Sequence, residues 1–145
     1  SPTSDKVYEL AVNLDDMTGE AIGYLCEQIR KAGTLDVWQV AAAFKKGRPG
    51  TIVHCLCQAK DLGFIEATIF KHSLSIGIRH QLWERTKLER ENVILKTEFG
   101  TVRAKVSTLP DGSVYRKFEY EDCARIARKT SKSIDEVITL LDASH

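Results

Sequence analysis

Residues 7–82 contain six short segments, and in each one the hydrophobic residues are spaced as in a β-strand or as in an α-helix. Apolar residues at helical spacing over 22–29 predict a helix that ends at Gly33, and a second helix is expected over 61–72. The remaining four segments are rich in strand formers, at residues 7–14, 35–44, 51–58 and from 75 onward. The order strand, helix, strand, strand, helix, strand predicts a ferredoxin-like βαββαβ unit.

Residues 83–145 show a different pattern, with short strands followed by two helices. A turn is expected at Pro110–Gly112, because proline presets one dihedral and glycine accepts a positive φ. Ser133 and Glu136 form a capping box for the last helix. The strands are expected at 92–100, 101–109 and 114–120, and the helices at 122–129 and 134–142. We therefore expect an α+β fold with two subdomains, 7–82 and 83–145.

The composition excludes several classes of protein. The net charge is +1, so bulk electrostatics favour neither nucleic acid nor an anionic membrane. No apolar run approaches the roughly 20 residues of a membrane span, and Ser1–Lys6 lacks the pattern of a signal peptide. The four cysteines do not form a disulfide framework, which predicts a reduced, cytoplasmic protein. Cys55 and Cys57 share one strand face and could bind a soft metal, but core packing is favoured.

The most basic stretch is FKKGRPG, which contains Lys45, Lys46 and Arg48. Two lysine charges, an arginine that can bind two oxygens at once and a glycine-rich backbone suit phosphate binding. From this stretch alone, however, a solvated hairpin tip is favoured, because charged glycine loops are common. The spacing is not that of a P-loop. A second basic cluster includes Arg79 and Arg85, which face the same side of a strand because their separation is even.

Two groups of acidic residues lie at or just before the starts of predicted helices. Asp15 and Asp16 stand before the first helix, where one carboxylate would suffice as a cap and the second is available for a metal. Glu119, Glu121 and Asp122 in FEYEDC are likewise more carboxylates than a helix cap requires. Together with the basic clusters, these acids suggest a chelated polyphosphate, in which Mg²⁺ or Mn²⁺ takes one or two carboxylates and completes its shell with phosphate and water.

Four motifs in order carry a family resemblance: NLDDMTGE, KKGRPG, IGIR and EYEDC. They resemble the carboxy-terminal domain of the LarC family, the nickel-insertion proteins of the nickel-pincer nucleotide cofactor. The likeness runs from about Tyr8 to Leu140. One departure is HSLSIGIR, where His72 replaces the acid usual in the family and Leu74 interrupts a run of hydroxyl residues.

The resemblance implies a lyase-class cyclometallase that inserts Ni²⁺ into pyridinium-3,5-bisthiocarboxylic acid mononucleotide. It also implies dependence on CTP with Mn²⁺ or Mg²⁺, a homo-oligomer, and a partner in the amino-terminal domain that this sequence lacks. The expected triphosphate contacts are Lys45, Lys46 and Arg48, then Arg79 and Arg85, with Thr18 at the helix start. Asp15 and Asp16 are expected to bind the metal, and Glu119, Glu121 and Asp122 to serve substrate, metal or structure.

Two other classes of function fit parts of the sequence. One is a non-catalytic, nucleotide-sensing oligomeric module, since ferredoxin-like units often bind regulators. The other is a helix-turn-helix DNA-binding protein, suggested by the apolar spacing in CARIARKTSKSIDEVITLL. Its recognition helix would carry Asp135, Glu136 and Asp142, which repel phosphate, so DNA binding is the least favoured of the three.

Overall fold

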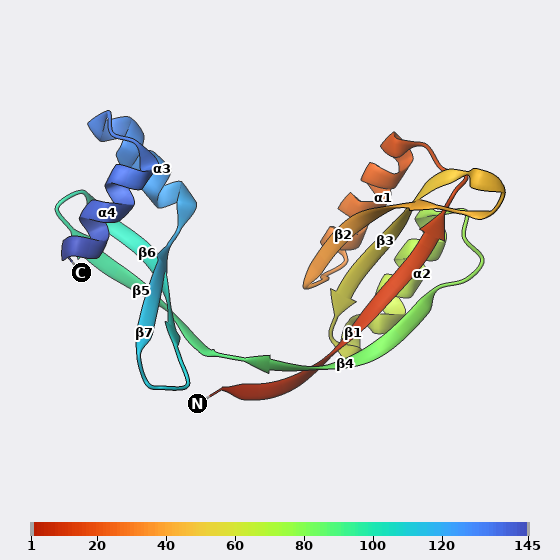
Figure 1. Cartoon of the computed structure of the whole chain (residues 1–145), viewed down its shortest axis with the longest axis horizontal. Coiled ribbons are helices and arrows are strands. Elements are labelled where there is room, and N and C mark those ends of the chain that lie inside the picture. The colour runs from red at the N-terminus through yellow and green to blue at the C-terminus, as the bar shows by residue number, and fades with distance from the viewer. Residues whose placement is uncertain (1, 145) are drawn as a thin grey trace. The chain divides into compact units, whose positions relative to one another are not determined.

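The computed structural model describes residues 2–144 and confirms a mixed α+β fold (Figure 1). The chain forms two compact units: one spans Ser4–Arg85, and the other consists of the chain from Thr86 onward together with residues 2–3. The boundary expected from the sequence, between residues 82 and 83, lies three residues before this division. Each unit has its own sheet and its own hydrophobic core. Among residues 2–144, no helix is both long enough and apolar enough to cross a membrane.

The first unit has the predicted βαββαβ order, with a four-stranded sheet in the order β2-β3-β1-β4. β1 is antiparallel to β3, with Leu10 opposite Cys55, and β3 is antiparallel to β2. Short 3-10 turns lie at Lys45–Gly47 and Ala59–Asp61. The strands are β1 (Thr3–Leu14), β2 (Asp36–Ala43), β3 (Pro49–Cys57) and β4 (Arg79–Lys87), and the helices are α1 (Gly19–Lys31) and α2 (Leu62–His72).

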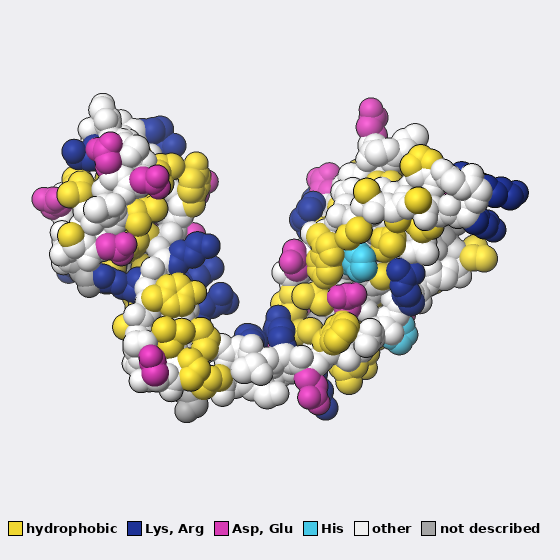
Figure 2. All heavy atoms as spheres, viewed as in Figure 1, with side chains coloured by type: hydrophobic (Ala, Val, Ile, Leu, Met, Phe, Trp, Pro, Cys, Tyr) yellow, Lys and Arg dark blue, Asp and Glu magenta, His cyan; other side chains and the backbone are white. Residues whose placement is uncertain are grey.

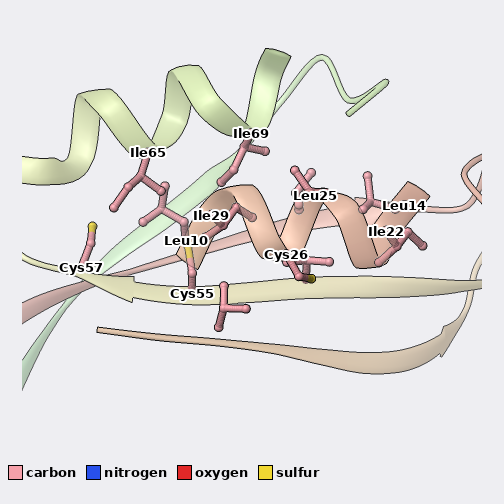
Figure 3. Close-up of a cluster of buried hydrophobic side chains, with 13 residues drawn as sticks. Leu10, Leu14, Ile22, Leu25, Cys26, Ile29, Cys55, Cys57, Ile65 and Ile69 are labelled. Carbon is pink, nitrogen blue, oxygen red and sulfur yellow. The ribbon is translucent and has the colours of Figure 1, made fainter. Parts of the chain in front are cut away.

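The core of the first unit lies between one face of this sheet and the two helices (Figure 3). Alternate residues of β1 and β3 meet the apolar stripe of α1, as the two periodicities require. Cys55 and Cys57 are fully buried in this core, which confirms the packing role predicted for them. Burial raises the pKa of Cys55 to about 12. A thiol with that pKa is protonated at neutral pH and is a poor metal ligand.

The opposite face of the sheet carries polar and aromatic side chains. The Trp38 and His54 rings stack with their centroids 5.2 Å apart, across the register pair that joins β2 to β3. His54 Nδ1 lies 3.4 Å from Glu9 Oε2 on β1. His54 therefore lies on the face opposite Cys55 and Cys57, as alternation along β3 requires.

The second unit pairs a three-stranded antiparallel sheet, in the order β5-β6-β7, with two helices. The predicted turn is present, with Gly112 at φ +85°. The Ser133 cap is confirmed, since the Glu136 backbone N–H donates to Ser133 Oγ at 3.1 Å, and the Glu136 carboxylate accepts from the Ser133 hydroxyl at 3.2 Å. The strands are β5 (Glu89–Thr97), β6 (Gly100–Thr108) and β7 (Val114–Phe118), and the helices are α3 (Tyr120–Thr130) and α4 (Ile134–Ser144).

Both helices of the second unit cover the same face of its sheet. Val102 and Ala104 of β6 are buried against Ile126 of α3 and against Val137 and Leu141 of α4. The burial of each larger side chain in this group, a valine, isoleucine or leucine, contributes about 1.5–3 kcal/mol to stability. The other face of this sheet is left uncovered by the helices.

Candidate functional site

Three segments of the first unit meet at one end of its sheet. Because β1 is antiparallel to β3, with Leu14 opposite Thr51, the tip of the β2–β3 hairpin lies beside the end of β1. At the other edge of β1, Arg79 Nη1 at the start of β4 donates to Asn13 Oδ1 at 2.9 Å. Figure 2 shows Lys and Arg side chains gathered at this end of the unit. We call these residues the sheet-end cluster: Asn13, Asp15, Asp16, Thr18, Lys45, Lys46, Arg48 and Arg79.

The hairpin tip has a tight, partly strained backbone. The Phe44 N–H donates to the Arg48 carbonyl at 2.8 Å, which closes the tip over three residues. Lys46 adopts φ +62° and Gly47 φ +70°. A non-glycine residue in this left-handed region costs on the order of 1 kcal/mol and is retained where the surrounding structure imposes it. The strain therefore falls on one of the lysines expected to contact phosphate.

Gly50 holds this tip against the end of β1. A Cβ atom built at Gly50 would lie 2.6 Å from the Leu14 carbonyl oxygen and 2.5 Å from the Phe44 ring. No side chain fits in that space without moving the backbone. The close approach of β1 to the hairpin tip thus depends on the absence of a side chain at this position.

The cluster carries a surplus of positive charge. Arg48 Nη1 lies 3.9 Å from Asp15 Oδ2, a long contact between side chains that are 49% and 31% exposed. Within residues 2–144, neither Lys45 nor Lys46 has an ion-pair partner, and both are exposed. The four cations of the cluster are therefore only partly neutralised in the free protein, which suits a polyanionic ligand.

Neither aspartate caps helix α1, which corrects the role expected for one of them. Thr18 is the N-cap, and its Oγ1 accepts a hydrogen bond from the Ala21 N–H at 3.1 Å. The hydroxyl proton of Thr18 is still free to donate to an anion at the helix start. Threonine is also a favourable N-cap, although it ranks below aspartate, so the two aspartates that precede Thr18 were the more obvious candidates in the sequence. Both carboxylates, at Asp15 and Asp16, remain available for a cation.

The cluster contains too few protein ligands to hold a metal alone. Among the described residues, no group of three or more His, Cys, Asp or Glu side chains is placed to bind a metal ion. Asp15 and Asp16 supply two carboxylates. A Mg²⁺ or Mn²⁺ ion held by one or two carboxylates takes its other ligands from phosphate and water. The donor set therefore fits a metal that arrives with a nucleotide.

Arg85 is not part of this cluster. It lies six residues beyond Arg79 on β4, a distance of roughly 20 Å along an extended strand. Its Nε and Nη2 donate to the two carboxylate oxygens of Asp5 at 2.9 and 2.8 Å, and this carboxylate raises the pKa of Arg85. The even spacing placed both arginines on one face correctly, but only Arg79 lies beside the hairpin tip.

The acids of FEYEDC belong to the second unit and differ in their availability. Asp122 accepts three hydrogen bonds from Arg103, from its backbone N–H at 2.8 Å and from Nε and Nη2 at 3.0 Å each. These bonds hold the pKa of Asp122 at about 2, and they join α3 to β6. Glu119 Oε1 lies 3.8 Å from Lys105 Nζ, and Glu121 is exposed. Glu119 and Glu121 are thus the acids in this group that can reach a ligand.

Sequence reasoning missed Asn13, which positions Arg79. The residue stands directly before LDD, and its strand parity places it on the face opposite the core. The sequence did offer one indication of this role: Asn13 is a polar residue at the end of a predicted strand, next to the suspected site. Its partner on β4 is 66 residues away in the sequence, so the bond itself had no local signature.

Comparison with known proteins places the chain in a family. Residues 1–138 match the family described as nickel insertion protein. A putative nickel insertion protein of Rhodopirellula baltica is 36% identical over 97% of this chain and 36% of its own length. The pyridinium-3,5-bisthiocarboxylic acid mononucleotide nickel insertion protein of Akkermansia muciniphila is 42% identical over 84% of this chain and 30% of its own length. The chain thus spans about a third of the length of these relatives.

Two solved structures share the fold over most of the chain. One is LarC2, the C-terminal domain of a cyclometallase involved in the synthesis of the NPN cofactor of lactate racemase, in its apo form. It has a TM-score of 0.86 and 33% identity, covering 99% of this chain and 100% of that one. The other is a protein of Methanopyrus kandleri, with a TM-score of 0.76, 21% identity and coverage of 92% and 85%, which supports the fold alone. The chain belongs to the nickel insertion protein family, as the motifs predicted.

Proposed function

We propose that this chain, as a member of the nickel insertion protein family, is the metal–CTP-binding part of a cyclometallase. The substrate would be pyridinium-3,5-bisthiocarboxylic acid mononucleotide, which the names of the Akkermansia muciniphila and Lactiplantibacillus plantarum relatives include. The observation that supports the nucleotide-binding role is the sheet-end cluster, where four cations and two carboxylates adjoin the start of a helix.

In this proposal the triphosphate replaces the internal partners of the cluster. Lys45 and Lys46 supply two ammonium groups at the hairpin tip. Arg48 would exchange its 3.9 Å contact with Asp15 for phosphate oxygens, and Asp15 and Asp16 would be the carboxylates that hold a Mn²⁺ or Mg²⁺ ion brought with the nucleotide. Arg79 is held in place for the same ligand by its bond to Asn13. Thr18 donates its hydroxyl proton to phosphate where the helix dipole favours an anion.

The nickel ion is a substrate rather than a resident cofactor. In the product it bonds to the two thiocarboxylate sulfurs and to a ring carbon, whose hydrogen leaves as a proton. Glu119 and Glu121 are proposed for substrate or metal, whereas the bonds from Arg103 give Asp122 a structural role. The proposal also includes a cytoplasmic homo-oligomer completed by the amino-terminal domain, and assignment to the lyase class.

A calorimetric titration tests the nucleotide site. We expect the chain to bind CTP in the presence of Mn²⁺, and to bind ATP more weakly. Lys46→Gly should weaken CTP binding at least tenfold, because it removes the ammonium group while glycine tolerates the local φ of +62°. Lys60→Gly is the matched control, since Lys60 is exposed beyond the far end of β3. Absence of CTP binding, or an equal loss in the control, contradicts the site.

Asp16→Ala tests the metal. It should reduce the gain in CTP affinity that Mn²⁺ produces and leave metal-free binding unchanged, because the carboxylate interacts with the nucleotide only through the cation. Binding alone does not separate a cyclometallase from a nucleotide sensor. Formation of the nickel-containing product by the protein that includes the amino-terminal domain makes that distinction, and a sensor would give none.

A further inference from the structure

The uncovered face of the second sheet carries a segregated set of cations. Side chains alternate between faces along each strand, and the register places Ile94 opposite Arg103 and Asn92 opposite Lys105. The opposite parity includes Val102 and Ala104, which are buried under the helices. We call the uncovered surface the basic face, defined by Arg90, Lys96, Arg103, Lys105 and Lys117.

Two lysines on the basic face lie directly opposite each other. Lys105 of β6 is the register partner of Lys117 of β7. Like charges at such a position destabilise an antiparallel pair. The carboxylates near these cations are Glu119, 3.8 Å from Lys105; Asp122, which accepts hydrogen bonds from Arg103; and Glu121, whose charge also acts on Arg103. Five cations near three carboxylates leave this set of described residues with a net charge of +2.

The basic face is also hollowed. A cavity of about 400 Å³ opens beside these strands, and the residues that line it are Asn92, Val93, Ile94, Arg103, Ala104, Lys105 and Glu119. This volume is within the range of small-molecule sites, roughly 300–1,000 Å³. Ile94 is 72% exposed and places one apolar side chain among the cations. Figure 2 shows Lys and Arg side chains gathered beside the strands of this unit.

We propose that the basic face binds the pyridinium mononucleotide substrate through its phosphate and thiocarboxylates; this inference rests on the proposed function. That substrate has a planar ring, one phosphate and two thiocarboxylates. Its net charge is roughly −3, since a phosphate monoester carries about −1.5 to −2 and the ring is cationic. Lys105 and Lys117 form a pair of point charges for the phosphate, and a bound anion relieves their mutual repulsion.

The ring and the thiocarboxylates have their own partners on this face. Ile94 offers an apolar surface for the ring. The Arg103 side chain is 61% exposed, and its Nη1 group makes none of the three bonds to Asp122. That group can donate to a thiocarboxylate while the bonds to Asp122 hold the guanidinium in place. The metal–CTP site and the substrate site would then lie on different units of the chain.

Titration of the whole chain with nicotinic acid mononucleotide tests this site, because that probe has a pyridinium ring, a ribose phosphate and a carboxylate. We expect saturable binding that Lys117→Glu weakens at least tenfold. Lys129→Glu is the control, since Lys129 is exposed on α3, which covers the other face of the sheet. Binding that survives Lys117→Glu, or that is lost equally in the control, overturns the proposal.

Further titrations identify the kind of ligand. Inorganic phosphate binding as tightly as the mononucleotide would overturn the assignment, since the ring would then contribute nothing. Heparin binding that depends on Lys117, without mononucleotide binding, would show a general polyanion surface instead. The Lys117→Glu protein should still bind CTP with Mn²⁺. That result keeps a failure of this inference distinct from a failure of the proposed function, which would abolish CTP binding in the unmodified chain.

Discussion

Replacing Asp122 by asparagine removes the charge that joins α3 to β6. Both carboxylate oxygens of Asp122 accept hydrogen bonds from Arg103, at 2.8–3.0 Å. Asparagine has nearly the same shape, but its amide NH₂ would face the guanidinium donors. At least one of the three bonds is therefore lost, and the remaining ones lose their charge assistance.

The magnitude follows from the pKa of Asp122. Hydrogen bonds from Arg103 lower this pKa to about 2 from an ordinary value near 4, a difference of roughly 2.5 kcal/mol between the two protonation states. Solvent screens the pair, because the Arg103 side chain is 61% exposed. We therefore expect Asp122→Asn to lower the free energy of unfolding of the second unit by about 1–2 kcal/mol at pH 7.

The same pKa fixes the pH dependence. A carboxylate whose pKa is depressed in the folded state contributes its full stability above the unfolded-state pKa, and loses it as the pH falls through the folded-state pKa. Protein with Asp122 should thus lose this contribution between about pH 4 and pH 2. Asp122→Asn should lack that part of the acid dependence.

Two measurements report on the stability of the two units independently. Trp38 and Trp83 both lie in Ser4–Arg85, so tryptophan fluorescence reports on the first unit alone. Hydrogen exchange of the β6 amides reports on the second. Asp122→Asn should speed exchange in β6 by about 5- to 30-fold and leave the fluorescence midpoint unchanged. The control Asp142→Asn, at an exposed position on α4, should change neither. Unchanged exchange, or an equal shift in fluorescence, would refute the reasoning.

Four further predictions concern the sites and the cores. Lys46→Gly should weaken CTP binding without lowering the thermal midpoint, because relief of about 1 kcal/mol of left-handed strain offsets the flexibility of glycine. Gly50→Ala should destabilise the first unit by about 1–3 kcal/mol in a fluorescence-detected urea titration, since the new methyl group would overlap a ring and a carbonyl oxygen; an unchanged midpoint would show that the tip can move. Lys117→Glu should stabilise ligand-free protein by a few tenths to about 1 kcal/mol at low salt, because it converts the repulsion with Lys105 to attraction; destabilisation would contradict that pairing. Cys55 should resist alkylation at pH 8 and react only in denaturant, since burial holds its pKa near 12; mass spectrometry of the labelled native protein checks this.

Features set by neighbouring residues were predictable from the sequence. The βαββαβ order, the Gly112 turn and the Ser133 cap each depend on contacts within a few positions. The burial of Cys55 and Cys57 followed from their alternation on an apolar strand. The family resemblance belongs to the same group, because its motifs are short and occur in a fixed order.

Competition among local candidates was harder to resolve. Asp15, Asp16 and Thr18 are all good helix caps, and the cap is whichever residue has extended dihedrals one position before the first helical residue. Thr18 has them, at φ −71° and ψ 157°. Composition does not report where the chain turns, so the sequence assigned this role to the wrong residue.

The sequence by itself determined the type and order of the elements and the family. Only the tertiary structure decided which distant side chains are neighbours. It joined Arg79 to Asn13, tied Arg85 to Asp5 instead, and aligned Lys105 with Lys117. Strand register sets these pairs, and register depends on hydrogen bonds and packing between segments far apart in the chain. Hydrophobic periodicity predicts on which face of a sheet a side chain lies. Its neighbour on the adjacent strand is fixed only when the two strands pair.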